Sequence, residues 1–413
     1  MAPHTTPAAP APLDLSRWRN VPNLLIGVGA VLALAGLIAN YRQFSYSWLT
    51  AYMFVLSLVL GAFFLVLVHH LFDASWSVPL RRACEHVACL SFPWMVIFFF
   101  PIAIFAKPVI YQWMRADPHA DPAVQSKYPL FTVSGFYLVA VVCFVVWWFF
   151  SSRLRYWSLR QDETGAVECT HKMRTLASAG IFLFAITLTL AAIMWMKALQ
   201  HHWFSTMYGV YFFAASVWTA LATVYLLTAV LQRQGYLRDV VHSDTYYYLG
   251  SLLFAFTVFY AYIAFSQYFI IWNANVPEET FWYKLRERGS WSDIAQVIIF
   301  GHFFVPFLAL LRIDVKLSLV MMTPICCWAW LMHFVDLSFN VLPVSNPEGF
   351  PTLWVWLPLG CAALMIGILI KVFLKQFHAH PPYPIKDPRL AESLNVYVPP
   401  ASAAKAASPG GAK

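Results

Sequence analysis

Ten long stretches of apolar residues run through this chain, and they constrain its fold more than any other feature. A helix needs roughly 20 mostly apolar residues to cross a bilayer, because the hydrocarbon core is about 30 Å thick and a helix rises about 1.5 Å per residue. Stretches of that kind predict an all-α integral membrane protein with about ten transmembrane helices. The predicted spans are 22–40, 47–72, 83–106, 130–151, 174–199, 204–231, 245–272, 293–312, 316–338 and 353–376.

The composition excludes an ordinary soluble domain. Hydrophobic residues make up 60% of the 413 residues and charged residues 11%, whereas about a quarter of the residues in a soluble domain are charged. The formal charge of +8 could indicate nucleic-acid binding, but basic residues scattered along one side of a membrane explain it better. The seven cysteines form no C-x-x-C pair and show no zinc-like spacing, so we expect no disulfide, metal site or iron–sulfur cluster.

The distribution of Lys and Arg predicts the orientation. Ten spans leave both termini on one side, and the alternate loops then place 19 of the 27 basic residues with the termini and 8 opposite. Because basic residues favour cytoplasmic loops, we expect both termini in the cytoplasm. The chain then divides into a disordered cytoplasmic N-terminus (1–20), a membrane domain (21–377) and a cytoplasmic tail (378–413). We expect the tail to be either free or extended along a partner subunit.

Ionisable residues at the cytoplasmic ends of the spans form the first candidate site, because such groups are costly near lipid. His69 and Asp73 are four residues apart and share one face of the second helix. A short hairpin leads to the third helix and brings Glu85 within reach. Carboxylates and imidazoles in alternation can transfer protons. The alternative interpretation is that these side chains lie at the depth of the lipid headgroups and are simply solvated there. The predicted cytoplasmic proton path comprises His69, His70, Asp73, Glu85, His86, His242, Asp244 and Tyr246.

A second candidate path crosses the interior toward the outer side. Polar residues recur at three- or four-residue steps along the seventh helix, and small or hydroxylated residues recur at similar steps along the sixth. Close helix packing is the alternative to a hydrated path there. For a lone buried histidine such as His302 the alternative is a hydrogen-bonded core residue, and interfacial solvation explains His201 and His202. The predicted path comprises Tyr260, Gln267, Asp293, His302, His333 and Asp336.

Two functional classes are disfavoured by the pattern. Haem b would need paired histidines on facing helices at matched depth, and the sequence offers such a pair only at the cytoplasmic rim. Secondary transporters often carry helices that are broken at matching midplane positions in two halves of the chain. The sequence shows no such pair of breaks.

Four stretches of sequence resemble a known family. Residues 203–213 read WFSTMYGVYFF, residues 252–268 read LLFAFTVFYAYIAFSQY, residues 272–280 read WNANVPEET, and residues 76–82 read WSVPLRR. They resemble ActF, the second NrfD-like membrane subunit of bacterial alternative complex III. That complex is a quinol:cytochrome c oxidoreductase, and the wider family includes the membrane subunit of polysulfide reductase. The resemblance covers the central eight helices.

The resemblance implies a fold, a location and partners. It implies two four-helix bundles, helices 2–5 and helices 6–9, with helices one and ten peripheral, in the bacterial inner membrane. It implies a non-catalytic or quinone-binding subunit, without a covalently bound cofactor, that meets menaquinone or another quinone and phospholipids. The implied partners are the sister NrfD-like subunit ActC, a periplasmic iron–sulfur subunit, c-type cytochrome subunits and a terminal oxidase, with no nucleic acid.

The function that follows is support of quinol oxidation and proton translocation by such a complex. One departure from the family pattern affects proton entry into the second bundle. The family carries an acidic residue, often after a histidine, before the Leu-Gly of the seventh helix, whereas Tyr247 and Tyr248 stand there in this chain. Asp244 or His242, one turn earlier, could substitute. A purely structural anchor for periplasmic redox subunits is the alternative function, and a secondary transporter is the third.

Overall fold

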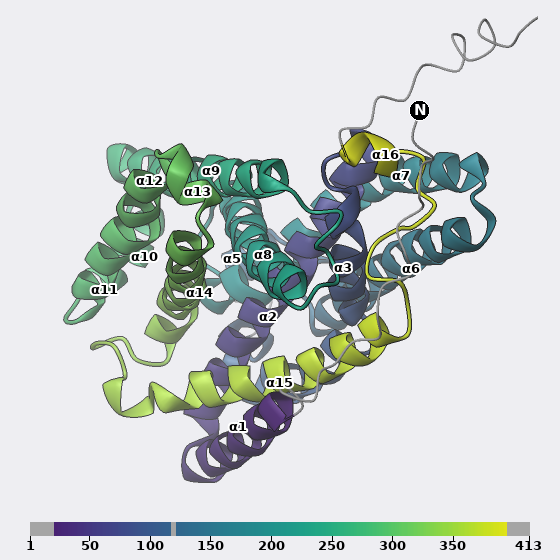
Figure 1. The fold of residues 1–413 in the computed structure, drawn as a ribbon. Helices are drawn as coiled ribbons and strands as arrows, with labels where there is room; N and C mark the ends of the chain where they lie inside the picture. The colour runs from purple at the N-terminus through teal and green to yellow at the C-terminus, as the bar shows by residue number, and fades with distance from the viewer. Residues whose placement is uncertain (1–19, 117–120, 395–413) are drawn as a thin grey trace, which may run out of the picture.

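The computed structural model describes residues 20–116 and 121–394 (Figure 1). In this part of the chain ten helical spans are long and apolar enough to cross a membrane, and no strand occurs. The prediction of an all-α, multi-pass membrane protein is therefore confirmed. Of the predicted N-terminal stretch 1–20 only Asn20 is described, and residues 395–413 of the predicted tail lie outside the described residues.

Half of the spans are single α-helices and half are composite. The single helices are α1 (Asn20–Ala39), α2 (Tyr41–Leu71), α6 (Val133–Thr164), α8 (Tyr208–Arg233) and α9 (Ser243–Ala274). The third span combines α3 (Val78–Ala88), η1 (Cys89–Ser91), α4 (Trp94–Phe105) and η2 (Ala106–Ile110), and the fifth combines α7 (Val167–Ala191), η4 (Ala192–Met196) and η5 (Lys197–Gln200). The last three composite spans are α11 (Trp291–Val297), η6 (Ile298–Phe304) and α12 (Val305–Leu310); α14 (Leu319–Val341) and η7 (Leu342–Val344); and η8 (Thr352–Trp354) and α15 (Trp356–His378).

Short helices fill the connections. They are η3 (Gln112–Met114), α5 (Pro122–Gln125), α10 (Pro277–Arg286), α13 (Ile313–Leu317) and α16 (Leu390–Ser393). We call the side at which α1 begins and α2 and α15 end the terminal face. The side at which α1 ends and α2 begins is the opposite face. These two names carry no statement about which side meets the cytoplasm.

The spans form two four-helix bundles with a peripheral pair, as expected. The first bundle contains α2, the third span, α6 and α7, and the second contains α8, α9, the eighth span and α14. Helices α1 and α15 lie side by side against α2 (Figure 1). Gly29 of α1 faces the backbone of α15 at Gly360 and Leu364, which is the close approach that small residues permit between membrane helices.

Helices α2 and α8 join the two bundles at the centre of the molecule. The apolar windows of both helices are 78% buried, more than those of the other described spans. Gly61 of α2 lies against the carbonyl oxygen of Ser216 in α8, so closely that a Cβ atom at Gly61 would collide with it. The backbones of the two bundles therefore meet directly at Gly61.

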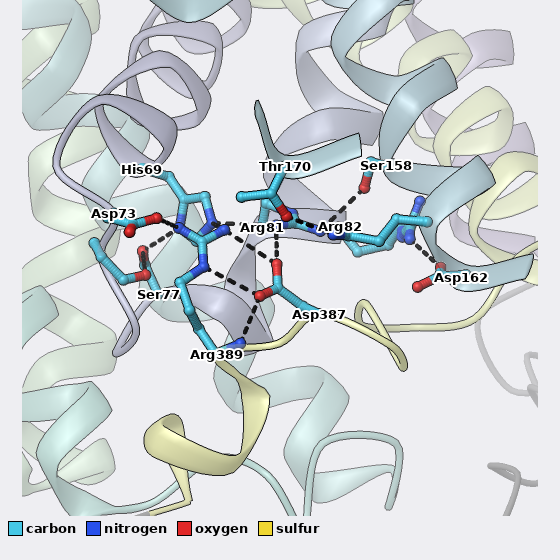
Figure 2. A network of polar contacts seen from close by, with 12 residues as sticks. His69, Asp73, Ser77, Arg81, Arg82, Ser158, Asp162, Thr170, Asp387 and Arg389 are labelled. Atoms are coloured by element: carbon cyan, nitrogen blue, oxygen red, sulfur yellow. Dashed lines mark hydrogen bonds and ion pairs between the residues drawn. The ribbon is translucent and has the colours of Figure 1, made fainter. Parts of the chain in front are cut away.

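Helices α6 and α7 continue past their apolar stretches on the terminal face. The predicted spans end at 151 and begin at 174, whereas the helices run to Thr164 and from Val167. Hydropathy identifies only the lipid-facing part of a helix, and the polar residues beyond it still complete backbone hydrogen bonds in helical form. The helical hairpin that results carries Asp162 and Thr170 to the end of the first bundle (Figure 2).

The chain turns back after α15 and ends its described part in α16 beside α3 (Figure 1). The backbone N–H of Ile385 donates to Asp162 Oδ1 at 2.9 Å, and Lys386 Nζ donates to the carbonyl oxygen of Glu163 at 2.6 Å. The sequence led us to expect a free tail or a tail along a partner subunit. Residues 379–394 instead pack on the first bundle of their own chain, and we call this segment the C-terminal strap.

Candidate functional site

Charged side chains gather at the terminal end of the first bundle, and we call this group the Arg81 cluster (Figure 2). Helix α3 supplies Arg81, Arg82 and Glu85, all almost completely buried. Glu85 follows Arg81 by four residues and Arg82 by three, so its carboxylate can reach both guanidinium groups along the helix. Arg81 Nε lies 3.1 Å from Glu85 Oε1, and Arg82 Nη1 lies 3.3 Å from Glu85 Oε2. The other members are His69, Asp73, Asp162, Asp387 and Arg389.

The C-terminal strap completes the Arg81 cluster. Asp387 forms an ion pair with Arg81, and its Oδ1 atom lies 3.1 Å from Arg389 Nε. Arg389 Nη1 in turn lies 2.6 Å from Asp73 Oδ1 at the end of α2. Burial alone would raise the pKa of Asp387, but Arg81 and Arg389 together hold that pKa well below its usual range. Asp387 is therefore an ionised carboxylate that stays paired at neutral pH.

The structure tests the predicted proximity of His69, Asp73 and Glu85. Arg81 stands between two of them, because its Nη1 atom lies 3.3 Å from His69 Nε2 while its Nε atom pairs with Glu85. Asp73 reaches the cluster through Arg389, and its side chain is 48% exposed. The three predicted residues thus belong to one cluster, joined by Arg81 and Arg389, which are not members of the predicted proton path.

The other predicted residues of this side lie around the cluster or in the second bundle. The ring of His70 meets that of His69 with centroids 4.9 Å apart, and the ring of His86 stacks on His380. Tyr246 donates to Gln232 Oε1 at 2.8 Å within the second bundle. The two remaining residues are exposed at the start of α9; they are His242 and Asp244.

A second polar cluster lies buried inside the second bundle, and we call it the Asp336 cluster. Asp336 and His333 come from α14, Tyr211 from α8, Tyr260 from α9 and His302 from η6. The hydroxyl of Tyr211 donates to Asp336 Oδ1 and lies 3.3 Å from the hydroxyl of Tyr260. Four of the six predicted interior residues therefore converge here, together with Tyr211, which the interpretation of the sequence missed.

The local sequence explains the position of His302. Pro306 has no backbone N–H to donate to the carbonyl of His302, four residues earlier, and the helix adopts the wider π form over Ile298–Phe304. The ring of His302 stacks between Trp218, with centroids 4.1 Å apart, and Tyr260, with centroids 3.8 Å apart. Neither ring nitrogen has a hydrogen-bond partner among the described residues.

Polar contacts extend the Asp336 cluster in two directions. His333 Nε2 lies 2.8 Å from Ser57 Oγ of α2, which leads toward the first bundle. Asn340 Nδ2 donates to the Tyr211 hydroxyl at 3.0 Å and leads toward the opposite face. There Arg286 Nη2 donates to the carbonyl oxygen of Asn340 at 2.9 Å, and burial lowers the pKa of Arg286 to about 9.

The last two predicted interior residues lie apart from the Asp336 cluster. Gln267 is buried further along α9, where it accepts from Ser205 Oγ at 2.7 Å and donates to the Tyr283 hydroxyl at 3.2 Å. Asp293 is exposed near the start of α11. The predicted stripe on α9 is thus buried at Tyr260 and Gln267, whereas Asp293 of the eighth span is exposed.

Two groups of three side chains in the described part of the chain have the composition and closeness of a metal site. One is His302, His333 and Asp336, and the other is Asp121, His201 and His202; in each group one ligand atom per residue lies within 4.8 Å of the others. The first group is completely buried in the Asp336 cluster, and the second lies in loops on the opposite face. The expectation of no metal site rested on the cysteines and did not consider these combinations.

Comparison with known proteins adds no identification. Neither the models of protein families nor the curated proteins include a match to this chain.

Proposed function

We propose that this chain is a proton-conducting membrane subunit of a quinol:cytochrome c oxidoreductase of the alternative complex III type. One observation carries the proposal. The two longest sequence stretches that resemble the family, 203–213 and 252–268, contain Tyr211 and Tyr260. These two phenols meet at 3.3 Å inside the second bundle, and Tyr211 donates to the buried carboxyl group of Asp336.

The chemistry of the Asp336 cluster supports proton transfer. A carboxyl group that is hydrogen-bonded to hydroxyl groups, and not ion-paired, can take up and release a proton without breaking a salt bridge. Among the described residues Asp336 forms no ion pair within 4.0 Å, and its Oδ2 atom has no hydrogen-bond partner. Hydroxyl groups and imidazoles on both sides of it can accept a proton and pass it on.

In this proposal the complex supplies the redox chemistry. The sister NrfD-like subunit, a periplasmic iron–sulfur subunit and c-type cytochrome subunits would oxidise menaquinone or another quinone in the bacterial inner membrane. The excess of Lys and Arg on the terminal face supports a cytoplasmic position for that face. The Asp336 cluster and Arg286 would then connect the interior with the periplasmic side, where quinol oxidation releases protons.

A structural anchor is the second candidate, and the Arg81 cluster favours it for the first bundle. Each carboxylate of that cluster is ion-paired with at least one arginine. Carboxylates held in this way resist protonation, because a proton would have to displace a guanidinium group. The ion-paired carboxylates of the first bundle therefore suit a structural support. The second bundle contains Asp336, whose carboxyl group is in no ion pair among the described residues.

A matched pair of variants in the purified complex tests the proposal. Asp336→Asn removes the buried carboxyl group, and Asp293→Asn removes an exposed one. Both complexes should assemble and retain quinol:cytochrome c activity in detergent, but only Asp336→Asn should weaken proton movement across sealed proteoliposomes. Unchanged coupling in Asp336→Asn would leave the anchor as the better function. If the chain purifies without any partner that stains for haem, both candidate functions, the proton-conducting subunit and the structural anchor, would be rejected.

A further inference from the structure

The geometry points to a binding site for a divalent first-row transition-metal ion, such as Zn²⁺, formed by Asp121, His201 and His202 on the opposite face. Asp121 lies at the start of α5, in the loop between the third and fourth spans. The two histidines directly follow η5, at the end of the fifth span. The proposed site therefore connects two loops of the first bundle, and it does not depend on the proposed function.

The distances between the three side chains suit such an ion. Asp121 Oδ2 lies 2.7 Å from His201 Nε2 and 3.5 Å from His202 Nε2. Zinc binds imidazole nitrogen and carboxylate oxygen at about 2.0–2.2 Å, so neighbouring ligand atoms of a tetrahedral site lie roughly 3.3–3.6 Å apart. The His202–Asp121 distance already has this value, and the His201–Asp121 distance needs to open by less than about 1 Å.

The type of ligand also fits. Two imidazoles and one carboxylate are a common protein ligand set for zinc and other first-row ions, with the remaining position open to water. The side chain of His202 is 60% exposed, so an ion can reach the site from water and His202 can rotate to bind it. The buried group in the Asp336 cluster offers no comparable route, because all three of its residues are almost completely enclosed.

Neighbouring groups orient the proposed ligands. The backbone N–H of Ala123 donates to Asp121 Oδ1 at 2.9 Å, which fixes the carboxylate and leaves Oδ2 facing the histidines. Lys127 Nζ donates to the carbonyl oxygen of His201 and holds the turn that bears both imidazoles. Supporting contacts of this kind set the orientation of metal ligands and contribute to affinity.

A bound ion would fasten the loop that contains Asp121 to the end of the fifth span. Without an ion, the His201–Asp121 hydrogen bond makes the same connection more weakly, and His202 only packs its ring against that of His201, with centroids 4.1 Å apart. The two possibilities differ in what they require of His202. A metal site needs this imidazole as a ligand, whereas a simple hydrogen-bonded pair does not.

The full chain, purified in detergent and treated with a chelator, allows a direct test. Titration with ZnCl₂, followed by calorimetry and by metal analysis after dialysis, should show about one ion bound per chain. His202→Asn should weaken the affinity at least about tenfold, the smallest loss expected even for a supporting residue. His171→Asn, an exposed histidine on α7 near the terminal face, is the matched control and should bind zinc like the unmodified chain.

Thermal unfolding gives a second readout. Zinc should raise the melting temperature of the unmodified chain and of His171→Asn by the same amount and that of His202→Asn by less, because stabilisation by a bound ligand falls as its affinity falls. Equal affinity in His202→Asn and the unmodified chain would overturn the proposal and place any bound zinc elsewhere. A chain that binds no zinc at millimolar concentration would overturn it as well.

Discussion

Asp387 forms a completely buried ion pair with Arg81, a residue that lies 306 positions earlier in the chain. The two residues come from the last described segment of the protein and from the start of the third span. Their contact closes the terminal end of the first bundle. The charge of Arg81 is shared between Asp387 and Glu85, so both carboxylates contribute to its compensation.

Loss of the Asp387 carboxylate should destabilise the first bundle strongly. We expect Asp387→Ala to lower the free energy of unfolding by about 3 kcal/mol, because Arg81 would then keep only Glu85, which it shares with Arg82, to compensate its buried charge. Arg312→Ala is the control, since its ion pair with Asp314 is exposed and worth little. Thermal unfolding in detergent measures both variants, and equal melting temperatures would contradict this role of the C-terminal strap.

The same carboxylate should give the protein a defined sensitivity to acid. The folded-state pKa of Asp387 is depressed, so its contribution to stability is complete above the unfolded value of about 4 and disappears as the pH falls toward the folded value. The difference in stability between the unmodified chain and Asp387→Asn should therefore be constant from neutral pH to about pH 5 and shrink below about pH 4. Unfolding curves recorded across this pH range measure the difference in the free energy of unfolding between the two proteins. A difference that grows as the pH falls would contradict the prediction.

Removal of a single hydroxyl group should interrupt the Asp336 cluster without disturbing the packing. Tyr211→Phe retains the ring but removes the donor to Asp336, so proton movement in sealed proteoliposomes should fall. Stability should change by only about 1–2 kcal/mol. Tyr262→Phe, on the exposed side of α9, is the control and should behave like the unmodified chain. If the two variants conduct protons equally, Tyr211 has no part in the path.

The contact between the two bundles should tolerate no side chain at Gly61. Gly61→Ala places a methyl group against the carbonyl oxygen of Ser216, and we expect a loss of about 1–3 kcal/mol, as for other overpacked sites. Gly27→Ala meets no atom within 4 Å and should be neutral or slightly stabilising, because alanine favours a helix over glycine by about 0.5–1 kcal/mol. Melting temperatures that rank the two variants the other way would show that α2 and α8 are free to separate.

The orientation of the chain can be measured with single cysteines in exposed loops. Glu278 is exposed on the opposite face and Arg238 on the terminal face. A membrane-impermeant thiol reagent should label Glu278→Cys in intact spheroplasts and Arg238→Cys only after the membrane is opened, since the excess of basic residues favours a cytoplasmic terminal face. The reverse pattern of labelling would invert the topology.

The spans could be predicted from the sequence because membrane insertion depends on local hydropathy. The same method missed the helical ends of α6 and α7, which are polar and gain nothing from lipid. Among the site residues, Tyr260, His302, His333 and Asp336 stood out because each is polar within an apolar stretch. Tyr211 belongs to the same cluster, but unlike Tyr260 it is not part of the polar stripe on the seventh helix, and tyrosines are too frequent in this chain for the residue type alone to mark it.

The Arg81–Asp387 pair could not be predicted for a different reason. The C-terminal strap is rich in proline and polar residues, a composition that also describes a disordered tail. Its order comes from long-range polar contacts of Asp387 with Arg81 and of Arg389 with Asp73 and His69, which no local pattern reports. Only the D-x-R spacing of Asp387 and Arg389 hinted at a paired site, and such a spacing is common by chance.

The position of the C-terminal strap has a consequence for biosynthesis. The ribosome makes Arg81 and Arg82 early, and the carboxylate of Asp387 emerges only after all ten spans have been translated. Until then Arg81 must remain hydrated, or share Glu85 with Arg82, at the rim of an incomplete first bundle. Closure of this bundle thus follows translation of Asp387, and a protein truncated before this residue presents a cell's quality-control proteases with a first bundle in which Arg81 has Glu85 but not Asp387 as a partner.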